Sequence, residues 1–161
     1  MTKYPLLVAL RDKVEGHGFL ADVAAHGRAL AIHEQNGQEG WLIHGVQPGG
    51  LVGAGTTFLE AYVDFRKAFT GVLFDIADEA ETFRIFTDRV RRFFDELDEV
   101  EEWQEAVRAV REGRVRSEGI PLPGDGIRKD KAESPRFVEV IRKHEFKPND
   151  NELDPQPAIA A

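Results

Sequence analysis

The stretch Gly53-Ala-Gly-Thr-Thr-Phe-Leu-Glu-Ala61 marks the point at which the hydrophobic pattern of this chain changes. Upstream, from residue 19, apolar and polar side chains alternate with a period of two, which is typical of β-strands. Downstream, apolar residues recur every three or four positions as far as Ile76, which predicts an amphipathic helix beginning at Thr57. Thr57 and Glu60 have the spacing of a capping box, in which the hydroxyl and the carboxylate each accept a backbone N–H.

The alternating region, residues 19–55, predicts a sheet of three or four mostly antiparallel strands. Its first two strands are predicted to be joined by a two-residue turn at His26-Gly27, and the next pair by a loop over residues 36–39. Pro48-Gly49-Gly50 is predicted to end the third strand. Residues 5–15, which begin with a proline, are predicted to form a short helix.

A second apolar repeat predicts a helical extension at about residues 81–112. The expected fold class is therefore α+β, with a small antiparallel sheet packed by a long amphipathic helix. Residues 1–112 are predicted to form this domain together with its extension. Residues 113–161 are expected to be loop-rich and flexible from about residue 148, with a short element at 136–146 that is either capped by Ser134 or a returning strand.

The composition limits the classes of function. An acidic balance, with a formal charge of -8, argues against a free-standing nucleic-acid-binding domain. Without cysteine the chain has no disulfide, thiol nucleophile or thiolate metal site, which fits a cytoplasmic protein. No apolar run reaches the ~18–20 residues of a membrane span, so no membrane partner is expected.

The negative charge is concentrated in residues 75–105, which hold twelve acids and four bases, a net of -8 that equals the charge of the whole chain. This stretch is either a solvated helix surface, which is common, or a face that meets a basic partner. If it meets a partner, Glu99, Glu101 and Glu102 are the predicted partner-binding residues.

The predicted helices carry many aromatic residues for one small sheet to cover. Apolar stripes usually face a core, but stripes that remain uncovered mark interfaces. We therefore predict a homo-oligomer, at least a dimer, with its interface at Phe69, Phe74, Phe86 and Phe94.

One candidate catalytic cluster depends on the register of the predicted hairpins. If residues 26–27 and 36–39 form the turns, then Asp22, His33 and His44 share one face of the sheet. Two imidazoles and a carboxylate can bind a metal or act as acid and base. A one-residue slip in register would separate them, and the alternative interpretation is a solvated polar face. We favour that alternative, and expect no catalytic residue, no metal and no cofactor.

The local sequence is similar to a known family. The stretch Gly40-Trp-Leu-Ile-His-Gly-Val-Gln-Pro-Gly-Gly50, together with residues 53–61, resembles the HicB-like antitoxin family. Gly119-Ile-Pro-Leu-Pro123 is similar to a stretch that follows the helix of that family. The resemblance implies a partial RNase H-like fold and a role in binding and blocking a small ribonuclease toxin, often as a dimer or tetramer. The DNA-binding segment of the family is not recognisable here, so direct nucleic-acid binding is not expected.

Three hypotheses about function remain. The first is a non-enzymatic, antitoxin-like protein that sequesters a small basic protein, such as a ribonuclease toxin. The second is a stand-alone oligomeric protein with a structural or regulatory role on the same fold. The third is a metal-dependent enzyme that uses Asp22, His33 and His44.

Overall fold

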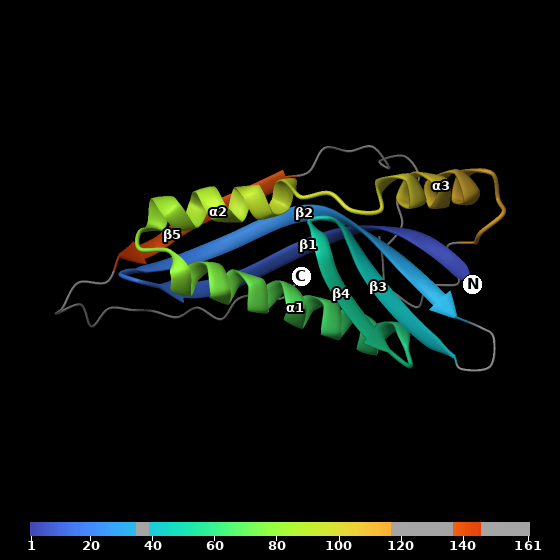
Figure 1. The fold of residues 1–161 in the computed structure, drawn as a ribbon, viewed down its shortest axis with the longest axis horizontal. Helices are drawn as coiled ribbons and strands as arrows, with labels where there is room; N and C mark the ends of the chain where they lie inside the picture. The colour runs from blue at the N-terminus through green and yellow to red at the C-terminus, as the bar shows by residue number, and fades with distance from the viewer. Residues whose placement is uncertain (35–38, 117–136, 146–161) are drawn as a thin grey trace.

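The computed structural model describes residues 1–34, 39–116 and 137–145 of the chain. In these residues one antiparallel sheet is packed by three α-helices (Figure 1), so the predicted α+β class is confirmed. The elements, in chain order, are β1 (Thr2–Gly16), β2 (Phe19–Glu34), β3 (Gly40–Gln47), β4 (Gly49–Gly55), α1 (Phe58–Glu79), α2 (Phe83–Asp95), α3 (Val100–Arg111) and β5 (Phe137–Glu145).

Strand β2 is the centre of the sheet, because three other strands pair with it. β1 pairs along its whole length, from Thr2 opposite His33 to Gly16 opposite Phe19. Along the other edge of β2, β5 pairs with the first half and β3 with the second, and β4 continues from β3 (Figure 1). The sheet therefore includes a strand from beyond residue 112, where the sequence placed the end of the domain. The end predicted to be flexible lies outside the described residues.

Residues 5–15 form most of β1, so the short helix predicted there is wrong. Residues 4–10 are all apolar, and such a run hides the period of two that would have indicated a strand. Pro5 lacks a backbone N–H, but β1 is an edge strand, where a proline is tolerated. The structure shows the alternation as a set of buried side chains, namely Tyr4, Leu6, Val8, Leu10 and Val14.

The turn predicted at His26-Gly27 is also wrong, because both residues lie inside the continuous strand β2. Gly27 lies where the edge of β2 changes its partner from β5 to β3. A Cβ there would lie 2.4 Å from the carbonyl oxygen of Gln47, so the glycine is needed for a close approach of two backbones. The β1–β2 hairpin turns instead at residues 17–18, where Gly18 has a positive φ of 80°.

Helix α1 begins with the capping box that the sequence predicted. The hydroxyl of Thr57 accepts the N–H of Glu60 at 3.1 Å, and the carboxylate of Glu60 accepts the N–H of Thr57 and both donors of Thr56. The helix lies directly against β4, since a Cβ on Gly53 would be 2.3 Å from backbone atoms of Ala61 and Phe65. Glycine at this position lets α1 pack on the strand backbone itself.

Helix α1 also contacts both ends of the strand path β1-β2-β3-β4. Asp64 accepts the backbone N–H of Ala54 in β4 at 3.0 Å. Arg66 donates to the carbonyl oxygens of Ala9 and Arg11 in β1, at 3.1 and 2.9 Å. Unpaired backbone groups of edge strands are templates for aggregation, and these two side chains satisfy some of them. One helix thus bonds to both end strands of this path, β1 and β4.

The two faces of the sheet carry separate apolar clusters. The larger cluster joins one face to α1 and α2, and the small alanines of β2 leave room there for the phenylalanines of the helices. Leu30 alternates with Ala29 and Ala31, so it points to the opposite face. There it packs with Val46 against α3, mainly through Trp103. Figure 1 shows α3 near the end of the sheet where the chain begins.

Three of the four aromatic residues predicted at an oligomer interface belong to the core. Phe69, Phe86 and Phe94 have exposed fractions of 0%, so they cannot contact a second copy in this fold. The prediction fails for these three because the sheet has five strands and covers more helix surface than three or four strands would. Phe74 remains available, with an exposed fraction of 50%.

The predicted helical extension is confirmed, and it consists of two helices that break at residues 96–99. The hydroxyl of Thr82 caps α2 by accepting the N–H of Ile85 at 3.2 Å. Glu99 precedes α3 with a φ of 53°, in the left-handed region that residues with a Cβ rarely adopt. Through this break the chain passes from the face of the sheet that α2 covers to the face that α3 covers.

The substitution Gly53→Ala tests the close packing of α1 on β4. The added methyl group would meet backbone atoms of α1, so we expect the free energy of unfolding to fall by about 1–3 kcal/mol, the usual cost of overpacking. Gly71→Ala is the matched control. A Cβ there would meet no atom within 4 Å, so removing a helical glycine should raise stability by about 0.5–1 kcal/mol. Urea unfolding measures both, and equal effects would contradict the contact.

The capping box should give stability a dependence on pH. Hydrogen bonds from the Thr56 hydroxyl, and then from the backbone N–H groups of Thr56 and Thr57, hold the pKa of Glu60 below its ordinary value. A carboxylate with a lowered pKa stabilises the fold above its unfolded-state pKa, and this contribution is lost as the pH falls through the folded-state pKa. Glu60→Gln should therefore be less stable at neutral pH, with a difference that shrinks in acid. Thermal unfolding across this range measures it, and a constant difference would refute the assignment.

Candidate functional site

A dense run of acidic side chains connects α2 to α3, in residues 95–102, which we call the acidic segment. Leu97 lies within it and has an exposed fraction of 56%. Most of the carboxylates around it are exposed, and Asp98 is half-buried. A single exposed leucine is common on protein surfaces, so the distinctive feature of this segment is its density of carboxylates. The six carboxylates belong to Asp95, Glu96, Asp98, Glu99, Glu101 and Glu102.

Backbone hydrogen bonds attach the acidic segment to the connection between β3 and β4. The N–H of Gly49 donates to the carbonyl oxygen of Glu96 at 2.9 Å, and the N–H of Asp98 donates to the carbonyl oxygen of Val46 at 3.0 Å. A Cβ on Gly49 would lie 2.8 Å from the Cβ of Asp98, so the glycine makes this approach possible. The sheet therefore fixes the position of the acidic segment.

The imidazole of His44 in β3 meets the acidic segment. Its Nε2 atom lies 2.8 Å from Oδ2 of Asp98, and the His44 side chain has an exposed fraction of 22%. Glu99 completes the group, because His44, Asp98 and Glu99 each offer one ligand atom within 4.8 Å of the other two. An imidazole beside two carboxylates can form an ion pair when it is protonated, or can share a cation with them when it is neutral.

The three predicted partner-binding residues are exposed at the start of α3, with different surroundings. Glu99 lies against His44 and Asp98, as described above. Glu102 forms an ion pair with Lys3, at the beginning of β1. Glu101 is exposed. The structure thus exposes all three residues, but it does not test whether they bind a partner.

The helix behind the acidic segment is anchored by Trp103. Its side chain has an exposed fraction of 2% and packs with Leu30 and Val46. The guanidinium carbon of Arg28 lies 5.2 Å from the centre of the indole ring, a cation–π distance. Burial lowers the pKa of Arg28 from its ordinary value. The indole Nε1 is buried without a hydrogen-bond partner, so the residue contributes through packing.

The predicted cluster of Asp22, His33 and His44 does not form. His33 pairs with Trp41 and lies on its face, with the two rings stacked 4.2 Å apart. His44 pairs with Leu30, and because Leu30 and His33 are three residues apart in β2, the two histidines point to opposite faces. The predicted register was displaced by one residue, which is enough to reverse a face. The third hypothesis, an enzyme built on this cluster, therefore lacks the shared site that it assumed.

Asp22 is also remote from both histidines, and has a structural role instead. Its side chain has an exposed fraction of 1%. Arg11, on the neighbouring strand β1, donates to it from both Nη2, at 2.8 Å, and Nε, at 3.3 Å. A buried carboxylate needs a paired charge of this kind, since an isolated one would be costly to remove from water.

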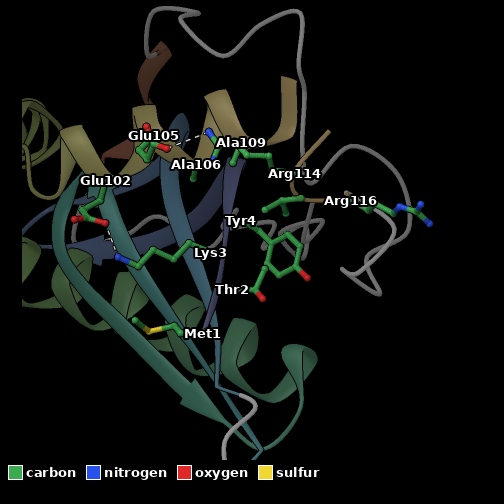
Figure 2. A pocket seen from close by; sticks show the side chains of 11 residues that line it. Met1, Thr2, Lys3, Tyr4, Glu102, Glu105, Ala106, Ala109, Arg114 and Arg116 are labelled. Carbon is green, nitrogen blue, oxygen red and sulfur yellow. Dashed lines mark hydrogen bonds and ion pairs between the residues drawn. The ribbon is translucent and has the colours of Figure 1, made fainter. Parts of the chain in front are cut away.

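A groove of about 840 Å³ lies between the start of β1 and α3 (Figure 2). Lys3 and Glu102 point toward one another across it, and Arg114 and Glu105 pair along its α3 side. The hydrogen bond from Arg114, followed by the charge of Arg108, lowers the pKa of Glu105. These charged groups neutralise each other within the groove, which makes it a weaker candidate for ligand binding than the acidic segment.

Comparison with known proteins identifies no similar protein. No protein-family model, curated protein or solved structure matches the chain. Within the described ranges, none of the helices has the length and apolar character needed to cross a membrane.

Sequence reasoning named Glu99 as a partner-binding residue and His44 as a candidate ligand with other neighbours, but it missed Asp98 and the meeting of His44 with Asp98. These two residues are 54 positions apart, and only the connection of the acidic segment to β3 and β4 brings them together. One signal was present, since Gly49 follows a proline and the pattern assigned it to a turn. The additional need of that glycine for contact with Asp98 has no local signature.

The role of Trp103 as an anchor predicts different outcomes for two substitutions. Trp103→Ala should lower the free energy of unfolding by about 3–5 kcal/mol, because it removes a buried aromatic side chain. Trp103→Phe should cost much less, since it keeps an aromatic ring and deletes an N–H that makes no hydrogen bond. Urea unfolding measures both, and equal losses would show that a phenyl ring cannot replace the indole as an anchor.

Proposed function

We propose that this chain is a non-enzymatic binding protein that holds a small basic protein against its acidic segment. The observation that carries the proposal is the fixed position of residues 95–102, a segment that holds six carboxylates and the exposed Leu97. Interfaces usually combine apolar contact at the centre with polar groups at the rim, and the segment offers groups of both kinds. The charges steer the partner and set its orientation, and the leucine supplies apolar contact.

The attachment of the segment to the sheet favours binding. A loop that is ordered only on association loses conformational entropy, and this loss weakens the complex. The backbone bonds from Gly49 and Asp98 order the segment in the protein alone, so less entropy remains to be lost. This preorganisation supports a binding role for the surface.

The kind of partner follows from charge and from the sequence resemblance. Six carboxylates in eight residues favour a partner with a cationic surface. A small ribonuclease toxin with a basic RNA-binding face has such a surface, and it is the partner that the resemblance to HicB-like antitoxins implies. We therefore propose an antitoxin-like role, in which the acidic segment occupies the basic face of the toxin.

Charge reversal tests this proposal. Glu99→Lys, Glu101→Lys and Glu102→Lys, combined in one protein, should reduce recovery of the partner by more than about tenfold, because attraction becomes repulsion. The control combines Asp75→Lys, Asp78→Lys and Glu81→Lys. These three exposed acids lie at the end of α1 and beyond it, and their reversal changes the net charge equally. The control should recover the partner in nearly normal amount.

The measurement is affinity purification from the native cell at low salt. The unsubstituted ("untouched") chain and both variants serve as bait, and mass spectrometry identifies the bound proteins. The proposal requires a small basic protein that is enriched by the untouched chain and the control. Equal recovery with all three baits would contradict the role of the acidic segment. Recovery of no partner by any bait would favour the second candidate.

The second candidate is a stand-alone oligomer, and exposed apolar residues of α1 favour it. Leu59, Val63 and Phe74 have exposed fractions of 64%, 45% and 50%. Their spacing of four and eleven residues places them on one side of the helix. A second copy that packed on this side would cover them.

Light scattering of the untouched chain and of a variant with Leu59→Ser, Val63→Ser and Phe74→Ser tests this candidate. An oligomer held by apolar contacts should persist at high salt and dissociate in the variant, because salt screens charges and leaves apolar contacts in place. A monomeric untouched chain at micromolar concentration would refute it.

A further inference from the structure

We propose that His44, Asp98 and Glu99 form a binding site for one divalent metal ion of the zinc type, and Zn²⁺ is the ion with which we test the site. The site goes beyond the proposed function, and it rests on the positions of these three side chains alone. One imidazole nitrogen and two carboxylate oxygens converge here, each within 4.8 Å of the other two.

The donor set selects the class of ion. Imidazole suits zinc, cobalt, nickel and similar ions, whereas Ca²⁺ and Mg²⁺ prefer oxygen ligands alone. The imidazole therefore separates this site from an acidic surface that attracts any cation. Three protein ligands leave further coordination positions open to water, as in the open zinc sites of enzymes.

The distances allow the site to close without a change in the backbone. Zinc lies about 2.0–2.2 Å from nitrogen and oxygen ligands, so its tetrahedral ligands are about 3.4 Å from one another. Nε2 of His44 and Oδ2 of Asp98 are 2.8 Å apart in a hydrogen bond, so these two atoms need only separate slightly when an ion replaces the proton between them. The glutamate side chain of Glu99 has rotatable bonds enough to bring its carboxylate to this distance, because it is exposed.

The fold holds two of the three ligands, His44 and Asp98, in place before any ion binds. His44 lies in β3, inside the sheet, and Asp98 is bound through its own N–H to Val46 in the same strand. The missing Cβ of Gly49 makes room for the approach of Asp98 to this strand. Ligands fixed by a scaffold lose little entropy on binding, and this favours the ion.

The charge around the site favours a dication as well. The acidic segment supplies the ligands Asp98 and Glu99. It also contains Glu96, Glu101 and Glu102, which lie within a few residues of these ligands in the sequence. Glu102 is paired with Lys3, so its charge is compensated. The remaining carboxylates attract a cation, which would in turn offset their mutual repulsion.

The test is calorimetric titration of the full chain, without an affinity tag and freed of metal by a chelator, with Zn²⁺. We expect one equivalent to bind, and the melting temperature to rise as the ion is added, because it binds the folded chain. Co²⁺ should bind with the visible absorption of a coordinated ion. Ca²⁺ and Mg²⁺ should bind at least about tenfold more weakly, since they do not use the imidazole.

Two ligand variants and one control identify the site. His44→Gln and Asp98→Asn should each weaken Zn²⁺ binding by more than about tenfold, the least that changes near a metal usually cause. His17→Gln is the control, since His17 lies in the β1–β2 turn and bonds to the Asp78 carbonyl oxygen. It removes a histidine from elsewhere and should leave binding unchanged. If a ligand variant does not fold, Glu99→Gln replaces it, because its side chain is exposed.

The proposal is overturned if the untouched chain binds no Zn²⁺. It is also overturned if folded His44→Gln and Asp98→Asn bind one equivalent as tightly as the untouched chain, because the ion would then lie elsewhere. These results are independent of the partner. A chain that binds Zn²⁺ and recovers no basic protein would retain the metal site and lose the proposed function.

Discussion

The contact between α1 and the edge strands sets the shape of this protein. Gly53 lacks a Cβ, and the backbone of α1 occupies the space that a side chain would fill. From this position Asp64 bonds to β4 on one side of the helix, and Arg66 bonds to β1 on the other. One helix therefore links the two end strands of the path β1-β2-β3-β4. It also satisfies backbone groups that would otherwise be open to another chain.

The long strand β2 follows from the same constraint. With β1 held against α1, β2 runs beside it over its whole length and exposes its other edge to two partners in succession. Gly27 lies at the change between them, where the Gln47 carbonyl oxygen approaches. The sheet thereby gains enough area on one face to cover α1 and α2, and leaves Leu30 on the other face to receive α3.

The acidic segment owes its position to these two layers. It spans the passage from α2 on one face of the sheet to α3 on the other, and the turn after β3 holds it through backbone bonds. Glu99 adopts a left-handed conformation at this passage, which costs energy for a residue with a Cβ. The result is a run of carboxylates on a fixed frame beside the imidazole of His44. Recognition of a basic surface and coordination of a cation both draw on this arrangement.

The sequence by itself determined the local structure wherever a pattern of a few neighbouring residues indicates a helix, a strand or a cap. The capping box at Thr57, the helical period that follows it and the α+β class could be predicted, because each depends on neighbours in the chain. The uniform apolar run of β1 has no period that indicates a strand, so the sequence predicts a helix there. Gly27 inside β2 looks like a turn residue, so the sequence predicts a turn where β2 in fact changes its partner strand. Tertiary structure alone decided the register, and with it the separation of His33 from His44 and the meeting of His44 with Asp98. A one-residue shift costs little within a strand but reverses every side chain, and only packing against the helices selects between the two arrangements.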